Sequence, residues 1–278
     1  MNEYPNICLE EIDKGRVNWL NYCDWGKFTP ILYVATTGGL CNRLFGIATC
    51  VPKAKAENRI IKVYWPLNGE DGTSAKWDDL FKDSLDMFSA WDLYWMMDVM
   101  HDVQWIHNTS EAFRKIDTSN IVLIKAGADG FSDRKFDHFD MTESTKWLNS
   151  LKVKQQLLDI ASSYNIDRNT LGIHLRIREE RFSDSLFKDN PITPSLLKKI
   201  ADWPNKVLVV SNSYEAKQKM ISMFGEKIVQ QDVSHSRSSD AVQLALVDLV
   251  MLAKCGQRIG NKDSTFYQLA EMWSTRDF

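Results

Sequence analysis

Short apolar runs alternate with longer segments of helical periodicity along the chain. In the N-terminal half, the β-branched and aromatic runs predict strands, and apolar residues three and four positions apart predict helices. The predicted strands cover 31–36, 60–65 and 121–125. The predicted helices cover 40–57 (with a kink or break at Pro52), two short pieces at 77–81 and 85–88, and 142–164.

The C-terminal half repeats this alternation after a polar segment, 165–169, that we interpret as an interdomain linker. Predicted strands are 171–176, 207–211, 228–230 and 257–260, and predicted helices are 194–201, 214–224, 240–254 and 264–273. Strands that alternate with helices indicate an α/β class, with a parallel sheet covered by helices.

One buried strand ends in a cluster of cations. The run from Leu171 carries His174, Arg176 and Arg178 at its carboxyl end. Ligands of open α/β sheets bind at that end of the strands, and the planar donors of arginine suit phosphate. The alternative interpretation is a strand edge whose charges are simply solvated.

A second segment enters two glycines, Gly38 and Gly39, directly after the first predicted strand and before a predicted helix. Glycines let the backbone approach a ligand, and helix N-termini favour anions. The segment lacks the glycine spacing of a dinucleotide site and the lysine of a P-loop, so neither is supported. A plain glycine turn is the other interpretation.

A third segment runs from Asp248 to Phe266, with a helix ending near Gly256 and a short strand following it. A polar turn then opens the last helix at Ser264 or Thr265. Their hydroxyls can cap that helix or bind a phosphate at its positive end, and both roles can coexist.

These segments together resemble the fucosyltransferase-like superfamily of GT-B glycosyltransferases, which includes α1,2-, α1,6- and protein O-fucosyltransferases. The resemblance covers roughly residues 31–50 and 171–273. It rests on Gly38–Arg43, on His174-Leu175-Arg176, on the strand ending in Ser211 and Asn212, and on Asp248–Phe266.

The resemblance implies two Rossmann-like domains whose parallel sheets face a central cleft. Residues 1–165 would form an acceptor-binding domain, and residues 166–278 a donor domain that binds the nucleotide sugar. The implied activity is a metal-independent, inverting transfer of fucose from GDP-fucose to a glycan, with the nucleotide sugar as a substrate and no cofactor.

Arg176 would grip the β-phosphate, Asn42 would orient the sugar or acceptor, and Arg43 would stabilise the leaving phosphate. His174 would bond ribose or phosphate, or satisfy its own strand end. Arg178 would assist Arg176, or pair with the acidic residues that follow it. The implied donor contacts are Gly38, Gly39, His174, Arg176, Arg178, Ser211, Asn212, Asp248, Asn261, Ser264, Thr265 and Phe266. Asp248 is equally readable as a structural partner.

Ile177 departs from the adjacent arginine pair of many fucosyltransferases. This departure keeps open a UDP-sugar donor such as UDP-xylose on the same scaffold. A non-catalytic module that binds nucleotide or sugar is a third possibility, because no spacing selects a general base. The candidates for that base are Glu70, Asp71, Asp98, His101 and Asp102.

Tryptophans are concentrated in the N-terminal half, and Trp91 and Trp95 lie at helical spacing. Indoles stack on the apolar faces of sugars, so this pair is our candidate acceptor-binding site. For any single tryptophan, core packing is the interpretation that we favour.

Composition fits these expectations. The net charge of −3 over 278 residues argues against a general nucleic-acid surface. The five cysteines lack metal-ligand spacing and there is no DxD motif, so we expect reduced thiols and no obligatory metal. The polar start of the chain shows neither signal nor membrane span, from which we expect a cytoplasmic bacterial or viral-type enzyme without a membrane partner.

Overall fold

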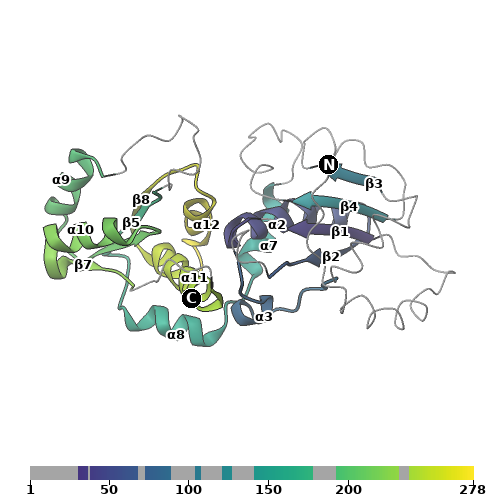
Figure 1. The fold of residues 1–278 in the computed structure, drawn as a ribbon, viewed down its shortest axis with the longest axis horizontal. Helices are drawn as coiled ribbons and strands as arrows, with labels where there is room; N and C mark the ends of the chain where they lie inside the picture. Colours follow the sequence, from purple (N-terminus) through teal and green to yellow (C-terminus); the bar gives the residue numbers. More distant parts are fainter. Residues whose placement is uncertain are drawn as a thin grey trace. The chain divides into compact units, whose positions relative to one another are not determined.

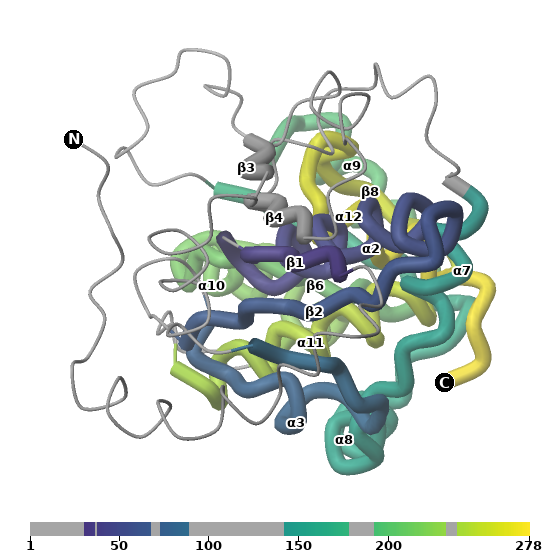
Figure 2. Tube along the Cα trace, turned by 90° about the vertical axis from the view of Figure 1, so that its right-hand side faces the viewer, coloured from purple at the N-terminus to yellow at the C-terminus, as the bar shows by residue number. Residues whose placement is uncertain are grey.

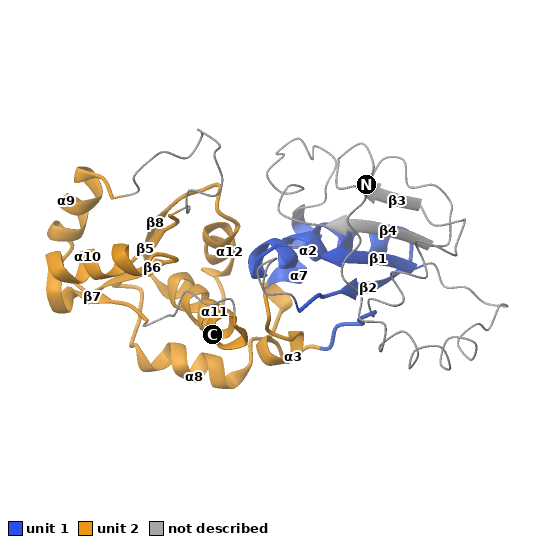
Figure 3. Ribbon diagram, viewed as in Figure 1, with its two compact units in different colours: residues 1–71, 84–148 blue, residues 72–83, 149–278 orange. Residues whose placement is uncertain are grey.

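The chain folds into two compact units in the computed structural model (Figures 1 and 3). The structure describes residues 31–36, 38–67, 73–88, 104–107, 121–126, 141–177, 192–231 and 238–278. The first unit comprises the described residues within 1–71 and 84–148, and the second those within 72–83 and 149–278. The predicted division into an acceptor domain, 1–165, and a donor domain, 166–278, stays a prediction.

The first unit contains a four-stranded sheet in the order β2-β1-β4-β3 (Figure 2). The strands are β1 (Ile31–Thr36), β2 (Ile60–Tyr64), β3 (Gln104–His107) and β4 (Ile121–Ala126). All pairs are parallel. β1 is buried from Leu32 to Thr36, as expected for a central strand of a parallel sheet.

The helix after β1, α2 (Leu40–Ala56), continues through Pro52, so a break at that proline is wrong. Proline lacks the N–H that would bond the carbonyl of Ala48 four residues earlier. The buried hydroxyl of Ser144, on α7 (Met141–Ser150), donates to that carbonyl at 2.8 Å. A side chain from far along the chain therefore replaces the missing helical bond.

The second unit contains a separate parallel sheet in the order β7-β6-β5-β8. Its strands are β5 (Leu171–Leu175), β6 (Val207–Ser211), β7 (Ile228–Val229) and β8 (Gln257–Gly260). One face of β5 places Leu171, Ile173 and Leu175 in a hydrophobic core. That core is completed by α9 (Pro194–Asp202) and α10 (Tyr214–Phe224), with a 3-10 turn, η2 (Gly225–Lys227), before β7.

The other face of β5 lies against α11 (Ser239–Lys254). A β-carbon at Gly172 would approach a methyl carbon of Leu252 to 2.7 Å and the sulfur of Cys255 to 2.9 Å. Glycine therefore permits the close contact between strand and helix. α12 (Thr265–Trp273) and α8 (Gln155–Ser163) both pack beside α11.

A short segment from the N-terminal half belongs to the second unit. It contains α3 (Trp77–Leu80), in which Trp77 and Leu80 are buried. Phe81 forms an antiparallel bridge with Val153, and the amide of Lys154 donates to the carbonyl of Leu80 at 2.9 Å. These bonds explain why the second unit is discontinuous in sequence.

Most predicted strands and helices are confirmed with ends shifted by one or two residues. Two further predictions are wrong. Residues 85–88 are extended, because Met87 bridges to Val63 and the amide of Phe88 donates to the carbonyl of Val63. Residues 142–164 form two helices instead of one, interrupted where Val153 pairs with Phe81. β3 was not predicted.

Among the helices that the structure describes, none has both the length and the apolar character needed to cross a membrane. Cys41, Cys50 and Cys255 are free thiols and buried. Burial raises the pKa of each thiol to about 12, which makes them unreactive at neutral pH.

Replacing Ser144 with Ala should destabilise the protein by about 1–2 kcal/mol, because the buried carbonyl of Ala48 loses its donor. In a Pro52→Ala background the cost should largely vanish, since the new N–H at position 52 can bond that carbonyl. Denaturant unfolding of the four variants of this cycle measures the coupling. An equal cost of Ser144→Ala in both backgrounds would contradict this account of the helix.

Candidate functional site

The second sheet changes direction at β5. The chain proceeds from β5 to β6 and β7 on one side, and then returns to place β8 on the other side. Crevices at such points, outside the carboxyl ends of the strands, are the usual ligand sites of open α/β sheets. His174 of β5 pairs there with Gly260 of β8, so the predicted motif lies at this point.

His174 is buried and stacks on the first turn of α12. Its ring lies 5.2 Å from the ring of Phe266 at an interplanar angle of 12°, and 6.3 Å from that of Tyr267. Its Nδ1 atom is buried without a hydrogen-bond partner. Burial, with a smaller effect of the Arg176 charge, lowers the pKa of His174 to about 4. The imidazole is therefore neutral at pH 7 and has an unused polar atom.

Arg176 follows β5 and is exposed. Alternate residues of a strand point to opposite faces, so residue 176 continues the face of His174 and Gly172. The effect of its charge on the pKa of His174 agrees with this placement. A cation therefore lies near the buried imidazole.

The N-terminus of α12 is shaped by Asn261. Its side-chain oxygen accepts from the amide of Asp263 at 2.9 Å, and its carbonyl accepts from the amide of Ser264 at 3.1 Å. Ser264 occupies the N-cap position, but its side chain makes no capping hydrogen bond. The hydroxyl of Ser264 therefore accepts from neither the N–H of Phe266 nor that of Tyr267, the two amides that an N-cap side chain usually bonds. A helix N-terminus of this kind favours an anion.

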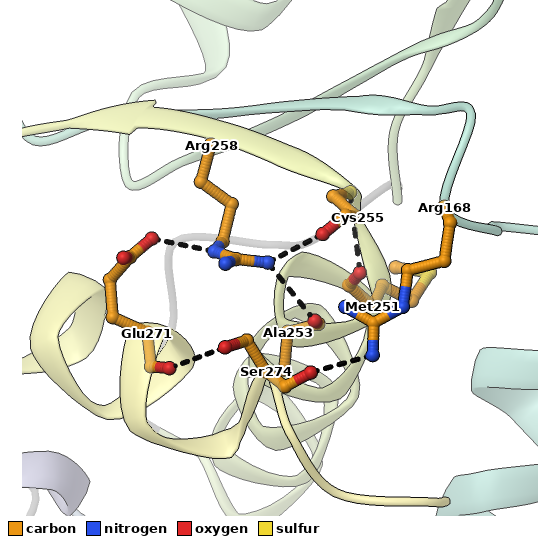
Figure 4. A network of polar contacts seen from close by, with 7 residues as sticks. All are labelled: Arg168, Met251, Ala253, Cys255, Arg258, Glu271 and Ser274. Atoms are coloured by element: carbon orange, nitrogen blue, oxygen red, sulfur yellow. Dashed lines mark hydrogen bonds and ion pairs between the residues drawn. The ribbon is translucent and has the colours of Figure 1, made fainter.

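A network of polar contacts holds α12 in place (Figure 4). Arg258 of β8 donates to the carbonyls of Ala253 and Cys255, at 3.2 and 2.5 Å, and its Nε donates to Glu271 of α12 at 2.6 Å. Arg168 donates to the carbonyl of Ser274 at 2.6 Å. One arginine therefore satisfies carbonyls at the end of α11 while pairing with α12, which fixes both helices to β8.

The end of β6 contacts the residues around Arg176. The hydroxyl of Ser211 donates to the carbonyl of Leu175 at 2.8 Å. The side-chain amide of Asn212 accepts from the N–H of Ile177 at 2.9 Å and donates to its carbonyl at 2.6 Å. Sequence reasoning predicted both residues as nucleotide contacts. In the structure their side chains bond the main chain on either side of Arg176.

In the first unit, Gly38 and Gly39 form the turn between β1 and α2. Gly38 has a φ of +77°, and a β-carbon there would lie 2.9 Å from the side-chain nitrogen of Asn42. Both the positive φ and the lack of room for a β-carbon therefore favour glycine at residue 38. Gly39 is the N-cap of α2, and Asn42 lies in the first turn, partly exposed.

Arg43 is fully buried within the first unit. Its Nε donates to the carbonyl of Gly38 at 2.7 Å, and Nη1 donates to the carbonyl of Pro66 at 2.6 Å. The guanidinium also lies 5.3 Å from the ring centroid of Trp65. These contacts fix the glycine turn against the chain that follows β2. The predicted role of Arg43 at a leaving phosphate stays a prediction.

Asp248 lies in the interior, within α11. It accepts from the side-chain amide of Gln231 at 2.5 Å, while the buried Lys217 donates to the carbonyl of Gln231 at 3.0 Å. Burial raises the pKa of Asp248 to about 6, against the lowering effects of Lys217 and Gln231. These are the contacts of a structural partner, and a donor contact by Asp248 stays a prediction.

The sequence did not indicate Lys217, Gln231, Arg258 or Gly260. A glycine within a predicted strand often marks a place where another segment packs closely against the strand, and this signal could have identified Gly260. The other three have ordinary surface-type side chains, and nothing local reveals that they turn inward.

Several candidates lie outside the described residues: Arg178, Trp91, Trp95, Glu70, Asp71, Asp98, His101 and Asp102. Within the described ranges, no group of three or more His, Cys, Asp or Glu side chains is arranged to hold a metal ion.

No family profile matches the sequence, and no curated protein is significantly similar to it. The structure nevertheless resembles that of NodZ α-1,6-fucosyltransferase from Bradyrhizobium. With NodZ co-crystallised with GDP, the TM-score is 0.59 at 13% identity, over 87% of this chain and 92% of that one. With NodZ soaked with GDP-fucose it is 0.61 at 12% identity, over 88% and 93%.

A mutant of Arabidopsis thaliana FUT1 in complex with GDP gives a TM-score of 0.55 at 14% identity, over 97% of this chain and 73% of that one. The chain has a fucosyltransferase-like fold. Within this fucosyltransferase-like fold, the sequence motifs that suggested the resemblance occupy the ends of β1, β5, β6 and β8 and the first turn of α12.

His174 and Asp248, both buried, should have opposite effects on stability between about pH 4 and 6.5. The pKa of His174 is lowered from 6.5 to about 4, so its contribution to stability is present above pH 6.5 and lost as the pH falls through 4. The pKa of Asp248 is raised from 3.8 to about 6, so its contribution is present below pH 3.8 and lost as the pH rises through 6. Each change amounts to about 3 kcal/mol over the full range.

We therefore expect Asp248→Asn to lose stability on acidification more steeply than the wild type, and His174→Gln to lose it less steeply. Denaturant unfolding at intervals from pH 4 to 7 measures these slopes relative to the wild type. Parallel curves for all three proteins would show that neither group titrates as its surroundings indicate.

Proposed function

We propose that the protein is a glycosyltransferase that transfers fucose from GDP-fucose to a glycan acceptor without a metal ion. The observation that supports this most is the grouping of Arg176, the unpartnered Nδ1 of His174 and the α12 N-terminus at one edge of the second sheet. Proteins of similar fold were crystallised with GDP and soaked with GDP-fucose.

The proposed chemistry follows from the charges. Transfer of a sugar from a nucleotide sugar leaves a diphosphate that gains negative charge as the glycosidic bond breaks. A fixed cation and N–H dipoles aimed at that diphosphate lower the barrier, because their charge is already oriented. Arg176 would supply the cation, and the first-turn N–H groups of α12 would supply the dipoles. These groups give the site a way to neutralise the leaving group without a metal.

The aromatic stack gives the proposed site its rigidity. His174 is fixed between the sheet and the ring of Phe266, and its burial keeps it neutral. A neutral imidazole can donate or accept one hydrogen bond at Nδ1, depending on its tautomer. We assign this atom to a polar group of the donor, either a ribose hydroxyl or a phosphate oxygen.

The proposal extends to a GT-B arrangement, with the donor bound by the second unit and the acceptor received by the first. Asn42, at the start of α2, would orient the sugar or the acceptor. Inversion at the anomeric carbon requires a group that takes the acceptor proton. The candidates for that group lie outside the described residues, so we assign none.

Ile177 supports a second candidate donor. It replaces the second arginine of the adjacent pair, and its side chain packs against the hydrophobic core that includes Leu175. The phosphate site would therefore carry one cation fewer than a site with two arginines. A UDP-sugar such as UDP-xylose, bound at the same edge of the sheet, is the alternative donor.

The test is calorimetric binding of GDP, UDP, GDP-fucose and UDP-xylose in the presence of EDTA, with wild type, Arg176→Ala and Lys219→Ala. We expect GDP and GDP-fucose to bind best, and Arg176→Ala to weaken them about 10- to 100-fold through loss of a charge-assisted contact. Lys219 is an exposed cation on α10, so Lys219→Ala controls for net charge and should bind as the wild type does.

Each other outcome changes the proposal in a defined way. Stronger binding of UDP keeps the transferase but replaces its donor. Binding of GDP-fucose without fucose transfer to any member of a glycan panel makes the protein a binding module. Equal weakening by Arg176→Ala and Lys219→Ala, or no nucleotide binding by the folded protein, contradicts the proposed site.

A further inference from the structure

Arg176 lies just beyond the regular sheet. β8 pairs with β5 only as far as His174, and β6 pairs with it as far as Leu175. Arg176 and Ile177 therefore have no partner strand in these two ladders. A flexible arginine would lose much of its binding energy to the entropy of ordering, so something must hold its main chain.

The side chain of Asn212 provides that support. A carboxamide carries the same donor and acceptor as a peptide group. Asn212 uses both on one residue, accepting from the N–H of Ile177 at 2.9 Å and donating to its carbonyl at 2.6 Å. It thus bonds the chain two residues beyond Leu175, where the backbone ladder between β5 and β6 ends.

Ser211 fixes the residue on the other side of Arg176. Its hydroxyl donates to the carbonyl of Leu175 at 2.8 Å and accepts from the amide of Ser213 at 3.0 Å. Ser213 in turn caps α10, because its side chain accepts from the amide of Ala216. The main chain before and after Arg176 is therefore bonded to a segment that is itself fixed between β6 and α10.

We propose that Asn212 is a positioning residue, which acts on the nucleotide through Arg176 by holding the main chain of Ile177. The oxygen of the Asn212 carboxamide and one of its two N–H hydrogens are already bonded to Ile177. This inference rests on the proposed function, because Arg176 has a ligand to position only if the site binds a nucleotide.

The magnitude of the effect has an upper bound. A residue that acts only through Arg176 cannot weaken binding by more than the loss of Arg176 itself. Two neutral hydrogen bonds on an exposed loop are worth less than an arginine–phosphate contact. We expect Asn212→Ala to weaken GDP binding about 3- to 30-fold, which is less than the effect of Arg176→Ala.

The deciding experiment is a double-mutant cycle in which calorimetry measures GDP binding. Asn212→Ala is introduced into the wild type and into Arg176→Ala, and we expect it to weaken binding less than about twofold in the second background. Asn205→Ala, at the opposite end of β6, is the matched control and should change binding less than about twofold in both. The same factor for Asn212→Ala in both backgrounds would overturn the inference and indicate a direct contact.

A second readout is independent of any ligand. The amide of Ile177 should exchange with solvent faster in Asn212→Ala than in the wild type, and unchanged exchange would overturn the inference. Asn212→Ser retains one hydroxyl and should fall between the two in both measurements. Thermal unfolding of each variant shows that it is folded. If the folded wild type binds no GDP, both the proposed function and this inference fail. If the wild type binds GDP but the fold-changes of Asn212→Ala and Arg176→Ala simply multiply in the double mutant, only this inference fails.

Discussion

The first turn of α12 can lie against the ends of β5 and β8 only because residue 260 has no side chain. A β-carbon at Gly260 would lie 2.4 Å from the ring of Tyr267 and 3.0 Å from the β-carbon of His174. At 2.4 Å a β-carbon would overlap the ring of Tyr267, so the ring, the helix or the strand would have to move. This close approach places Phe266 over His174. The proposed donor site therefore depends on one backbone contact, and Arg258 keeps α12 in the position that the contact requires.

The two units share the same local arrangement of sheet, glycine, helix N-terminus and arginine. Each has a parallel sheet in which the chain changes direction beside its first strand, and each places a glycine and a helix N-terminus near that point. In each, an arginine that is largely buried bonds nearby carbonyls: Arg43 in the first unit and Arg258 in the second. These two arginines stabilise the turns, whereas Arg176 is exposed and is the cation that we propose for the donor. Residue type alone does not tell whether an arginine stabilises a turn or binds a ligand. The contacts of its side chain distinguish these two roles.

The sequence predicted the parallel α/β class and most elements because their signals are local. The strands predicted at 171–176 and 207–211 and the helix predicted at 240–254 lie within one residue of where the structure has them. The failures arise from contacts between distant residues. Ser144 supports α2 through Pro52, and Val153 interrupts a helix by pairing with Phe81. No pattern within either segment contains that information.

At the site, too, local signals were predictable and contacts between distant residues were not. Apolar periodicity predicted the end of β5, where His174 and Arg176 lie, and the start of α12. Both ends are where the sequence placed them, within one residue. The direction of each side chain could not be predicted in this way. Asn212 was expected at the nucleotide but bonds Ile177, and Asp248 is enclosed with Gln231 in the interior. Both outcomes depend on segments that are adjacent in space and distant in sequence.

The most direct test of the central claim follows the imidazole of His174 by ¹⁵N NMR during addition of GDP, with His174→Gln to assign its signals. If a nucleoside diphosphate binds at this edge of the second sheet, the nitrogen signals of a neutral His174 should shift and saturate as GDP binds, because the environment of its unpartnered Nδ1 changes. The shift should be much reduced at the same GDP concentration in Arg176→Ala. Saturation of the protein with GDP while the His174 signals remain unmoved would contradict the account.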